Sequence, residues 1–339
     1  MTNPLVSIQI AVYNGERYIR DCLNSVKDQT YKNIEVIIFD NNSSDQTREI
    51  VQKEFPEYTL VAHPKNLGMW PAQERALSYS SGEHIVALSV DVMLDGHFVE
   101  KAVEAIEQDT SIGGIQGKIY RYDFSQLAGR GYLSNRIIDT CGFLMHRSRK
   151  VGNIGHGEED RGQFNESREI FAVEGAVPVY RRRALEDARV GGIISDPDFF
   201  WYGDDLDLPW RMRLFGWKHV YTPEAVAYHD RSTTKRPGNF LRFGTLSQRQ
   251  SIPMEKRRLD WANVRFTIIK NEYIINILKD LPFIIWREFM VFGYTFLFEP
   301  GVFKAMPRFF KLLPSMLHKR KLIMKRVQVR SAEMHRWYI

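Results

Sequence analysis

Residues 5–14 read LVSIQIAVYN, an apolar run rich in β-branched residues that ends at a turn, and this stretch decides the fold. A run of this kind bounded by turn residues is typical of a buried strand. Residues 16–26 then place apolar side chains at helical spacing, and residues 34–39, IEVIIF, return to the strand pattern. Strand, helix and strand in succession predict two parallel strands joined by a crossover helix.

The same alternation continues along the first third of the chain. The Ser- and Asp-rich stretch 40–45 can cap a helix over 46–55. We therefore predict an α/β fold with a mixed, mainly parallel sheet and flanking helices. In such sheets ligands bind beyond the carboxyl ends of the strands, where Asn14, Asp40 and Asp91 stand. Further strands are expected over 58–62 and 84–90, and further helices over 72–79 and 96–107.

Three polar residues at expected strand ends each allow two interpretations. Asp40 is either an Asx-turn residue or an acceptor for a ring N–H of a bound base. Asp91 either caps the next segment or holds Mg²⁺ or Mn²⁺ against a phosphate, since these ions use one or two protein carboxylates plus substrate oxygens. His229, which ends a strand expected over 220–229, is either a ligand of a metal or diphosphate or a hydrogen-bonded structural residue.

A stretch of aromatic and acidic residues, 198–217, reads DFFWYGDDLDLPWRMRLFGW. Four aromatic residues in a row are followed by Asp204, Asp205 and Asp207 at the start of an expected helix. These acids either cap and charge the first turn or include a general base. The second interpretation has a physical reason, because a carboxylate near apolar rings is partly desolvated and accepts a proton more readily near neutral pH.

Residues 120–165 lose periodicity and are rich in Gly, Arg and His, which favours a mobile substrate loop. Residues 174–181 then resemble a strand that presents Arg181 and two further arginines at its end. The two cysteines, Cys22 and Cys141, form no metal or disulfide pattern and are expected to be small core residues in a reducing compartment. No secretory leader is recognised, so a cytoplasmic location is expected.

The charge of the chain is concentrated at its C-terminal end. The whole chain carries +6, but residues 301–339 hold ten Lys or Arg residues and one Glu, a net charge of +9. Residues 268–298 are apolar and aromatic yet interrupted by charges, which disfavours a spanning helix. An apolar stripe over 302–317 contains Pro307 and Pro314, each expected near the start of a short helix.

We therefore predict two parts, a catalytic domain over 1–235 and an amphipathic, basic helical region over 236–339. Basic amphipathic helices suit an anionic membrane surface, here the inner face of the cell membrane. The alternative is ordinary packing of these helices on the main domain. Nucleic acid is a third possible partner, but the aromatic residues favour lipid, and we expect no nucleic acid to bind.

The order of these motifs resembles family 2 glycosyltransferases of the GT-A fold, and among them the rhamnosyltransferase-type members that build bacterial cell-surface polysaccharides. The likeness covers about the first 235 residues. It rests on the ordered motifs 6–14, 39–45 (FDNNSSD), 66–68 (NLG), 89–91 (SVD), 202–211 (YGDDLDLPWR) and His229.

The resemblance implies an inverting transfer of rhamnose or a similar sugar from a dTDP- or UDP-linked donor to a lipid-linked glycan, with Asp205 as the base. It implies that Asp91 and His229 hold Mg²⁺ or Mn²⁺. The implied acceptor or supporting residues are Trp201, Tyr202, Asp204, Asp207 and Trp210. The implied donor-binding residues are Ala11, Tyr13, Asn14, Asp40, Asn42, Asn66, Gly68, Ser89 and Arg211.

Three positions depart from the family pattern. Ser89 stands where an acid is common, Gln73-Glu74 replaces Arg-Asn, and Asp204 replaces a Glu. The alternative to an enzyme is thus a catalytically idle nucleotide-binding scaffold at the membrane. Turnover that depends on Asp205 would exclude that alternative.

Overall fold

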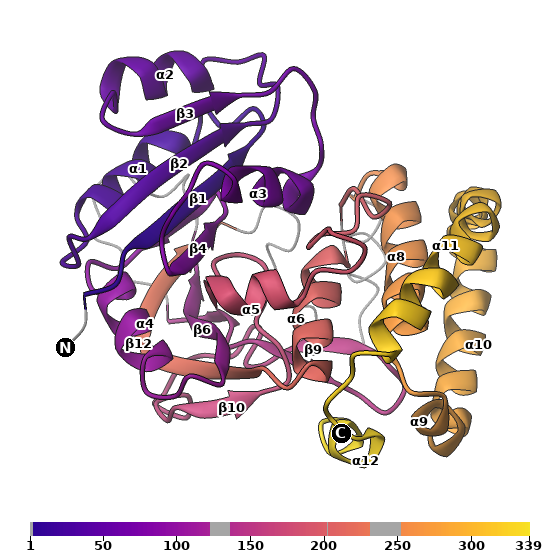
Figure 1. The fold of residues 1–339 in the computed structure, drawn as a ribbon. Coiled ribbons are helices and arrows are strands. Elements are labelled where there is room, and N and C mark those ends of the chain that lie inside the picture. Colours follow the sequence, from indigo (N-terminus) through magenta and orange to yellow (C-terminus); the bar gives the residue numbers. More distant parts are fainter. Residues whose placement is uncertain (1–2, 123–135, 202, 231–251) are drawn as a thin grey trace.

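The computed structural model describes residues 3–122, 136–201, 203–230 and 252–339, and its N-terminal half has the expected alternation of strands and helices (Figure 1). The strands line up at the centre of the molecule and the helices cover them. The first elements of this half are β1 (Val6–Val12), α1 (Ile19–Lys27), β2 (Ile34–Asp40), α2 (Thr47–Glu54), β3 (Thr59–Ala62), α3 (Met69–Leu77), β4 (His84–Leu88), β5 (Val92–Leu94) and α4 (Phe98–Ile106).

One large mixed sheet organises the protein, in the order β10-β12-β6-β11-β4-β1-β2-β3. Strand β1 pairs in parallel with both β2 and β4, as the sequence predicts. Strand β11 is antiparallel to both of its neighbours, β4 and β6, and therefore makes the sheet mixed. The remaining strands are β6 (Ile112–Arg121), β7 (Ile138–Thr140), β8 (Phe143–Met145), β9 (Val151–Asn153), β10 (Arg168–Ile170), β11 (Val179–Arg181) and β12 (Lys218–His229).

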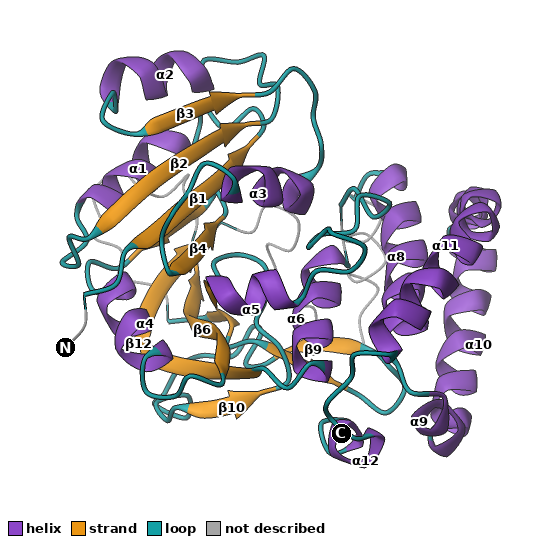
Figure 2. Ribbon diagram, viewed as in Figure 1, coloured by secondary structure: helices purple, strands orange, loops and turns teal. Residues whose placement is uncertain are grey.

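Helices cover both faces of the sheet, which gives three layers (Figure 2). Alternate residues of β1 pack with α1, α2 and α4 in one core cluster, where the free thiol of Cys22 is buried. Helices α3, α5 (Arg182–Asp187) and α6 (Asp204–Leu214) contribute to the clusters on the other face, where Cys141 is buried. This arrangement confirms the predicted GT-A fold class and the core positions of both cysteines.

The sequence analysis misses β6, the ten-residue strand that pairs with β12. Its strand pattern is weakened by three glycines, which are needed for close packing. A Cβ on Gly117 would lie 2.3 Å from the carbonyl oxygen of Ala225 and 2.8 Å from the ring of Phe98. Glycine therefore allows β6 to lie against its neighbours, at the cost of a recognisable apolar alternation.

Two other local predictions are corrected. The expected loop over 120–165 contains the short strands β7, β8 and β9, while residues 123–135 lie outside the described part. The expected strand over 174–181 is reduced to β11, and the arginines after it begin α5. Arg181 binds Glu107 and the carbonyl oxygens of Ile106 and Ile112, so it does not face the ligand edge of the sheet.

The C-terminal helices form a layer that packs on α6 and on itself. Helix α8 contacts both α6 and α11, and Pro314 lies inside α11 rather than at a helix start. The backbone N–H of Ile339 donates to Met145, which ties the end of the chain to the body. The expected boundary near residue 235 lies outside the described residues. The helices are α8 (Met254–Asn271), α9 (Ile274–Lys279), α10 (Leu281–Phe298), η3 (Pro300–Ala305), α11 (Met306–Met324) and α12 (Ser331–His335).

Candidate active site

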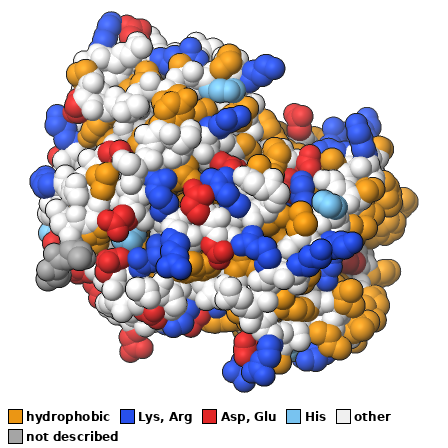
Figure 3. Space-filling view, in the orientation of Figure 1, with side chains coloured by type: hydrophobic (Ala, Val, Ile, Leu, Met, Phe, Trp, Pro, Cys, Tyr) orange, Lys and Arg blue, Asp and Glu red, His pale blue; other side chains and the backbone are white. Residues whose placement is uncertain are grey.

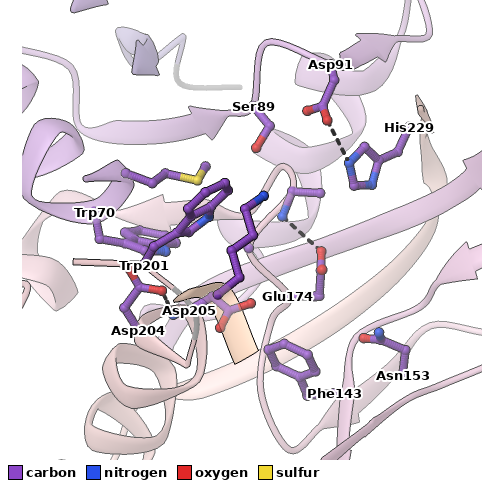
Figure 4. A pocket seen from close by; sticks show the side chains of 14 residues that line it. Trp70, Ser89, Asp91, Phe143, Asn153, Glu174, Trp201, Asp204, Asp205 and His229 are labelled. Carbon is purple, nitrogen blue, oxygen red and sulfur yellow. Dashed lines mark hydrogen bonds and ion pairs between the residues drawn. The ribbon is translucent and has the colours of Figure 1, made fainter. Parts of the chain in front are cut away.

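A pocket of about 370 Å³ opens at the carboxyl ends of the central strands, between β4, β12, α6 and α8. In Figure 4, Asp91 and His229 point towards each other on one side of the pocket, and Asp204 and Asp205 lie on the other. Its lining residues are Met69, Trp70, Ser89, Asp91, Phe143, Asn153, Glu174, Gly175, Ala176, Trp201, Asp204, Asp205, His229 and Lys256.

His229 stands between two carboxylates. Its Nε2 lies 3.5 Å from Asp91 Oδ2 and its Nδ1 lies 2.9 Å from Asp139 Oδ2. Burial opposes a charge on the ring, but the hydrogen bonds and charges of Asp139 and Asp91 prevail and raise the pKa of His229 to about 10. Asp139, on β7, thus fixes the orientation of the ring so that Nε2 faces Asp91.

The Asp91–His229 pair can hold a divalent ion only if the ion displaces the proton on His229 Nε2, because a metal ligand must be a neutral ring nitrogen. The carboxylate of Asp91 is 28% exposed, and the His229 nitrogen that faces it belongs to a ring already oriented by a second carboxylate. Among the described residues no group of three or more His, Cys, Asp or Glu side chains is placed to hold a metal. Of the described side chains, an ion here would thus have these two as ligands and would need oxygens from a bound ligand, as Mg²⁺ commonly does.

The acids of α6 begin after Gly203, whose left-handed backbone (φ 76°) turns the chain into the helix. Asp204 is 7% exposed, and one of its oxygens accepts a hydrogen bond from the N–H of Asp205. Burial raises the pKa of Asp204 to about 7, and the nearby charge of Asp207 contributes to that rise. A Cβ on Gly175 would lie 2.8 Å from the Asp205 Cβ, so only glycine lets Asp205 approach this loop.

The other face of α6 is directed away from the pocket. Asp207 accepts hydrogen bonds from Lys270, Asn271 and Arg211, and it is almost fully buried. Arg211 also donates to the carbonyl oxygens of Ala188 and Ile194. Because these donors are engaged in the protein interior, Arg211 is not available to a diphosphate, and we withdraw its assignment to the donor.

Trp210 also lies away from the pocket. Its ring is fully buried and packs edge-on against Phe171 and Tyr338. The structure therefore gives Asp207 and Trp210 supporting positions inside the protein, away from any acceptor. Trp201 and Asp204 do line the pocket. Tyr202 lies outside the described residues.

The expected donor residues of the N-terminal half gather where β1 to β4 end. Asp40 is buried, accepts hydrogen bonds from the N–H of Ser43 and pairs with Arg48 at 2.5 Å. The side-chain oxygen of Asn66 accepts hydrogen bonds from the side chain of Asn41 and from the backbone N–H of Gly68. Only Ser89 of this group also lines the pocket. The others, Ala11, Tyr13, Asn14 and Asn42, lie at or just after the ends of β1 and β2.

Three of the expected donor positions have constrained backbones. Asn14 (φ 51°) and Asn42 (φ 71°) adopt the left-handed conformation, which asparagine tolerates better than most residues. Gly68 (φ 88°) has no room for a side chain, because a Cβ there would lie 2.0 Å from the carbonyl oxygen of Phe200. The NLG motif and the aromatic stretch before α6 are therefore in direct contact.

The sequence analysis did not assign several pocket residues. Trp70 and Lys256 come from segments to which no function was assigned, and Glu174 falls in the segment expected to be a strand. Asp139, which does not line the pocket but orients His229, was also not assigned. The one available signal is the Glu174-Gly175-Ala176 turn, since a glycine between an acid and a small residue can mark close approach of backbone. The carboxylate of Glu174 accepts a hydrogen bond from the backbone N–H of Ala176 and so stabilises this turn.

A mixed sheet with acids at its strand ends, an Asp–His pair beside them and paired acids on a facing helix is the arrangement expected for the GT-A fold. Residues 7–188 match the family described as glycosyl transferase family 2. Because that match covers more than half of the chain, the chain belongs to this family.

The chain is similar in sequence to curated glycosyltransferases and a polysaccharide synthase from bacteria. The chain is 31% identical over 114 residues to "Putative glycosyltransferase EpsH" of Bacillus subtilis, a third of each chain. It is 24% identical over 225 residues to "Poly-beta-1,6-N-acetyl-D-glucosamine synthase" of Staphylococcus epidermidis, which is 66% of this chain and 49% of that one. The chain thus spans at most about half the length of these relatives.

Solved structures share the fold across nearly the whole chain. Mannosyltransferase PcManGT from Pyrobaculum calidifontis, in complex with GDP-Man and Mn²⁺, has a TM-score of 0.54 at 17% identity and covers 96% of this chain and 86% of its own. S. aureus TarS 1–349, in complex with UDP-GlcNAc, has a TM-score of 0.55 at 17% identity and covers 98% of this chain and 89% of its own. These likenesses extend the fold assignment into the C-terminal helices.

Proposed function

We propose that this chain transfers a sugar, with inversion, from a nucleoside diphosphate donor to a hydroxyl group of a growing polysaccharide. The observation that carries the proposal is a single pocket in which the Asp91–His229 pair and the Asp204–Asp205 pair lie on opposite sides. An inverting displacement needs a base on one side of the reacting carbon and positive charge at the departing diphosphate on the other. The pocket provides both.

The roles follow from the surroundings of each group. Asp205, at the start of α6 beside the Gly175 turn, takes the proton of the acceptor hydroxyl. Asp91 and His229 would hold the divalent ion, which would neutralise charge on the diphosphate. Trp70 and Trp201 line the pocket and would contact the bound sugar. The sequence resemblance predicts rhamnose as that sugar, so dTDP-rhamnose belongs in any donor panel beside UDP- and GDP-linked sugars.

Metal dependence can be tested with the nucleotides alone. With Mn²⁺ present, Asp91→Ala should weaken the best-binding of UDP, GDP and dTDP by about 10-fold or more, because the ion loses one of its two protein ligands. In EDTA, wild type and variant should bind alike. Titration calorimetry measures both, with exposed Asp28→Ala as a matched control. If chelation leaves nucleotide binding and donor turnover of the wild type unchanged, the metal assignment is withdrawn.

We further propose that α9 and α10 hold the protein on the inner face of the cell membrane, where a lipid-linked acceptor would be found. Helix α10 stands at the outer edge of the C-terminal layer, and Figure 3 shows hydrophobic side chains gathered there with Lys and Arg beside them. Thr295 is the one fully buried residue of α10. Its large exposed side chains are Leu281, Phe283, Ile285, Trp286, Phe289, Met290, Phe292, Phe296, Leu297 and Phe298.

This proposal moves the membrane contact from the basic segment 301–339 to α10. Several of the cations in that segment are engaged on the body, since Lys319 binds Asp196 and Asp198, and Arg326 binds Asp187. Others, such as Lys304 and Lys311, are exposed near α10 and can meet anionic headgroups. The hydrophobic contribution therefore comes mainly from α10 and part of the electrostatic one from 301–339.

Helix α10 is the one helix in the described residues that is long and apolar enough to cross a membrane, by length and composition. The sequence analysis considered this region too charged to span. Glu288, in the middle of α10, binds Arg265 of α8 at 2.5 Å and Arg287 at 2.9 Å. Because charged pairs are costly at the centre of a bilayer, we propose that α10 lies in the interface plane.

Vesicle binding tests this orientation. The double variant Trp286→Glu, Phe289→Glu should bind vesicles of mixed neutral and anionic lipid at least about 10-fold more weakly, because two aromatic anchors, each 65% exposed, are lost. Tyr79→Glu is the control. Tyr79 is 54% exposed but follows α3, and its substitution should leave vesicle binding unchanged. If the wild type co-sediments with none of the vesicle compositions, the membrane proposal is contradicted.

A further inference from the structure

One wall of the pocket is supplied by the C-terminal layer. Lys256, in the first turn of α8, lines the same pocket as Asp91, His229 and Asp205. Its ammonium nitrogen lies 3.6 Å from the centroid of the Trp201 ring, an arrangement in which the aromatic face stabilises the cation. Burial lowers the pKa of Lys256, which reflects a partly desolvated position.

The position of this lysine is fixed by contacts between α8 and the loop that precedes α6. Asn263 donates to the carbonyl oxygens of Phe199 and Trp201, at 2.9 and 2.8 Å. Thr267 donates to the carbonyl oxygen of Gly203 at 3.1 Å. Helix α8 is therefore attached to the same loop that leads into Asp204 and Asp205. Lys256 is held at a constant place relative to those acids.

Among the described residues that line the pocket, few side chains carry a positive charge that could bind a phosphate group. Four carboxylates line the pocket, those of Asp91, Glu174, Asp204 and Asp205, and the basic side chains are His229 and Lys256. The arginines expected from the sequence to bind phosphate are engaged elsewhere. Arg211 donates to the carbonyl oxygen of Ala188 in the protein interior, and Arg181 forms an ion pair with Glu107. A ligand that carries phosphate would be repelled by the acids unless these two cations and a metal compensate.

We propose that the ammonium group of Lys256 binds a phosphate group of the ligand in this pocket. The phosphate belongs either to the diphosphate of the donor or to the diphosphate that links an acceptor to its lipid. This inference rests on the proposed function, and it makes the C-terminal layer part of the active site. Lysine suits the role because its ammonium group is a compact charge. From its position over the Trp201 ring it can approach a phosphate oxygen without needing a fixed bidentate geometry.

The test compares phosphate-bearing probes with probes that lack phosphate. The donor probes are UDP, GDP and dTDP with their parent nucleosides, all with Mn²⁺, and the acceptor probe is farnesyl diphosphate. Lys256→Met should weaken the phosphate-bearing probe by about 10- to 100-fold and leave the nucleosides unchanged. Lys256→Arg should restore most of the affinity. Lys101→Met, on the surface of α4, is the control, and thermal unfolding checks that each variant is folded.

Each outcome has a definite meaning. If Lys256→Met loses affinity only for a nucleotide, Lys256 binds the donor diphosphate. If it loses affinity only for farnesyl diphosphate, Lys256 binds the acceptor diphosphate. Equal affinity of wild type and Lys256→Met for every phosphate probe overturns the inference, and so does failure of the wild type to bind any of them. If the wild type binds a nucleotide diphosphate tightly, and Lys256→Met binds both that nucleotide and farnesyl diphosphate as tightly as the wild type does, this inference fails while the proposed function stands.

Discussion

Asp205→Asn should lower kcat by about 10²–10⁴-fold, the usual effect of removing a general base. The affinity for the nucleotide should change little, because amide and carboxylate have the same shape and the Gly175 turn accommodates either. Release of nucleoside diphosphate from the best donor measures kcat, and calorimetry measures the affinity. Asp28→Asn, an exposed carboxylate at the end of α1, should behave like wild type.

The neighbouring acid provides a comparison with a different expected signature. Because the pKa of Asp204 is raised to about 7, its burial favours the protonated form, and stability is lost as pH rises from the unfolded value towards 7. Asp204→Asn should therefore raise the unfolding temperature at pH 8, with the difference vanishing near pH 4. If Asp205→Asn retains near-normal turnover while Asp204→Asn loses it, Asp204 is the base and the assignment is wrong.

Lys270→Met should lower the free energy of unfolding by about 3–5 kcal/mol, the usual cost of leaving a buried charge without its partner. Lys270 is 1% exposed and lies 2.8 Å from both Asp196 and Asp207. These contacts join α8 to α6 and to the loop before it. Urea unfolding measures the change, and Lys53→Met, on the exposed face of α2, should alter stability by no more than about 0.5 kcal/mol.

The same variant should change the response to acid. Burial would raise the pKa of Asp196, but the charges of Lys270 and Lys319 prevail and hold it at about 2. A depressed pKa gives stability that is present above about pH 4 and is lost as pH falls towards 2. In Lys270→Met the pKa of Asp196 should rise towards its ordinary value, so the stability lost between about pH 4 and pH 2 should be smaller than in wild type. A variant as stable as wild type at pH 7 would show that the buried pair contributes nothing to the docking of α8.

The sequence predicts the fold well because strands, turns and helices alternate without interruption through residue 107. It fails at β6, where close packing requires glycine, so that the apolar pattern is lost. It also could not place the C-terminal layer, since the contacts that dock α8 on α6, such as Lys270 with Asp207, join residues 63 positions apart. Long-range ion pairs leave no periodic trace in a sequence.

The candidate site was partly predictable for a geometric reason. Residues Asp205 and Asp207 are two positions apart on a helix and so point to nearly opposite sides, which means that both cannot face one pocket. Arg211 is four positions after Asp207, the spacing of an intrahelical ion pair, and the structure has that pair. The spacing allows that pair but does not by itself make Asp207 and Arg211 structural, because Asp204, three positions before Asp207, lines the pocket. Lys256 had no comparable signal, because its role depends on where α8 docks.

The central claim is that this pocket transfers a sugar with inversion from a nucleotide donor. Proton NMR of donor cleavage, started with an α-linked nucleotide sugar and followed before the free sugar mutarotates, tests it most directly. Water then takes the place of the acceptor, so no acceptor need be known. We predict that wild type first releases the β-anomer and that Asp205→Asn releases almost none. First release of the α-anomer by the wild type, or equal release by the variant, would contradict the account.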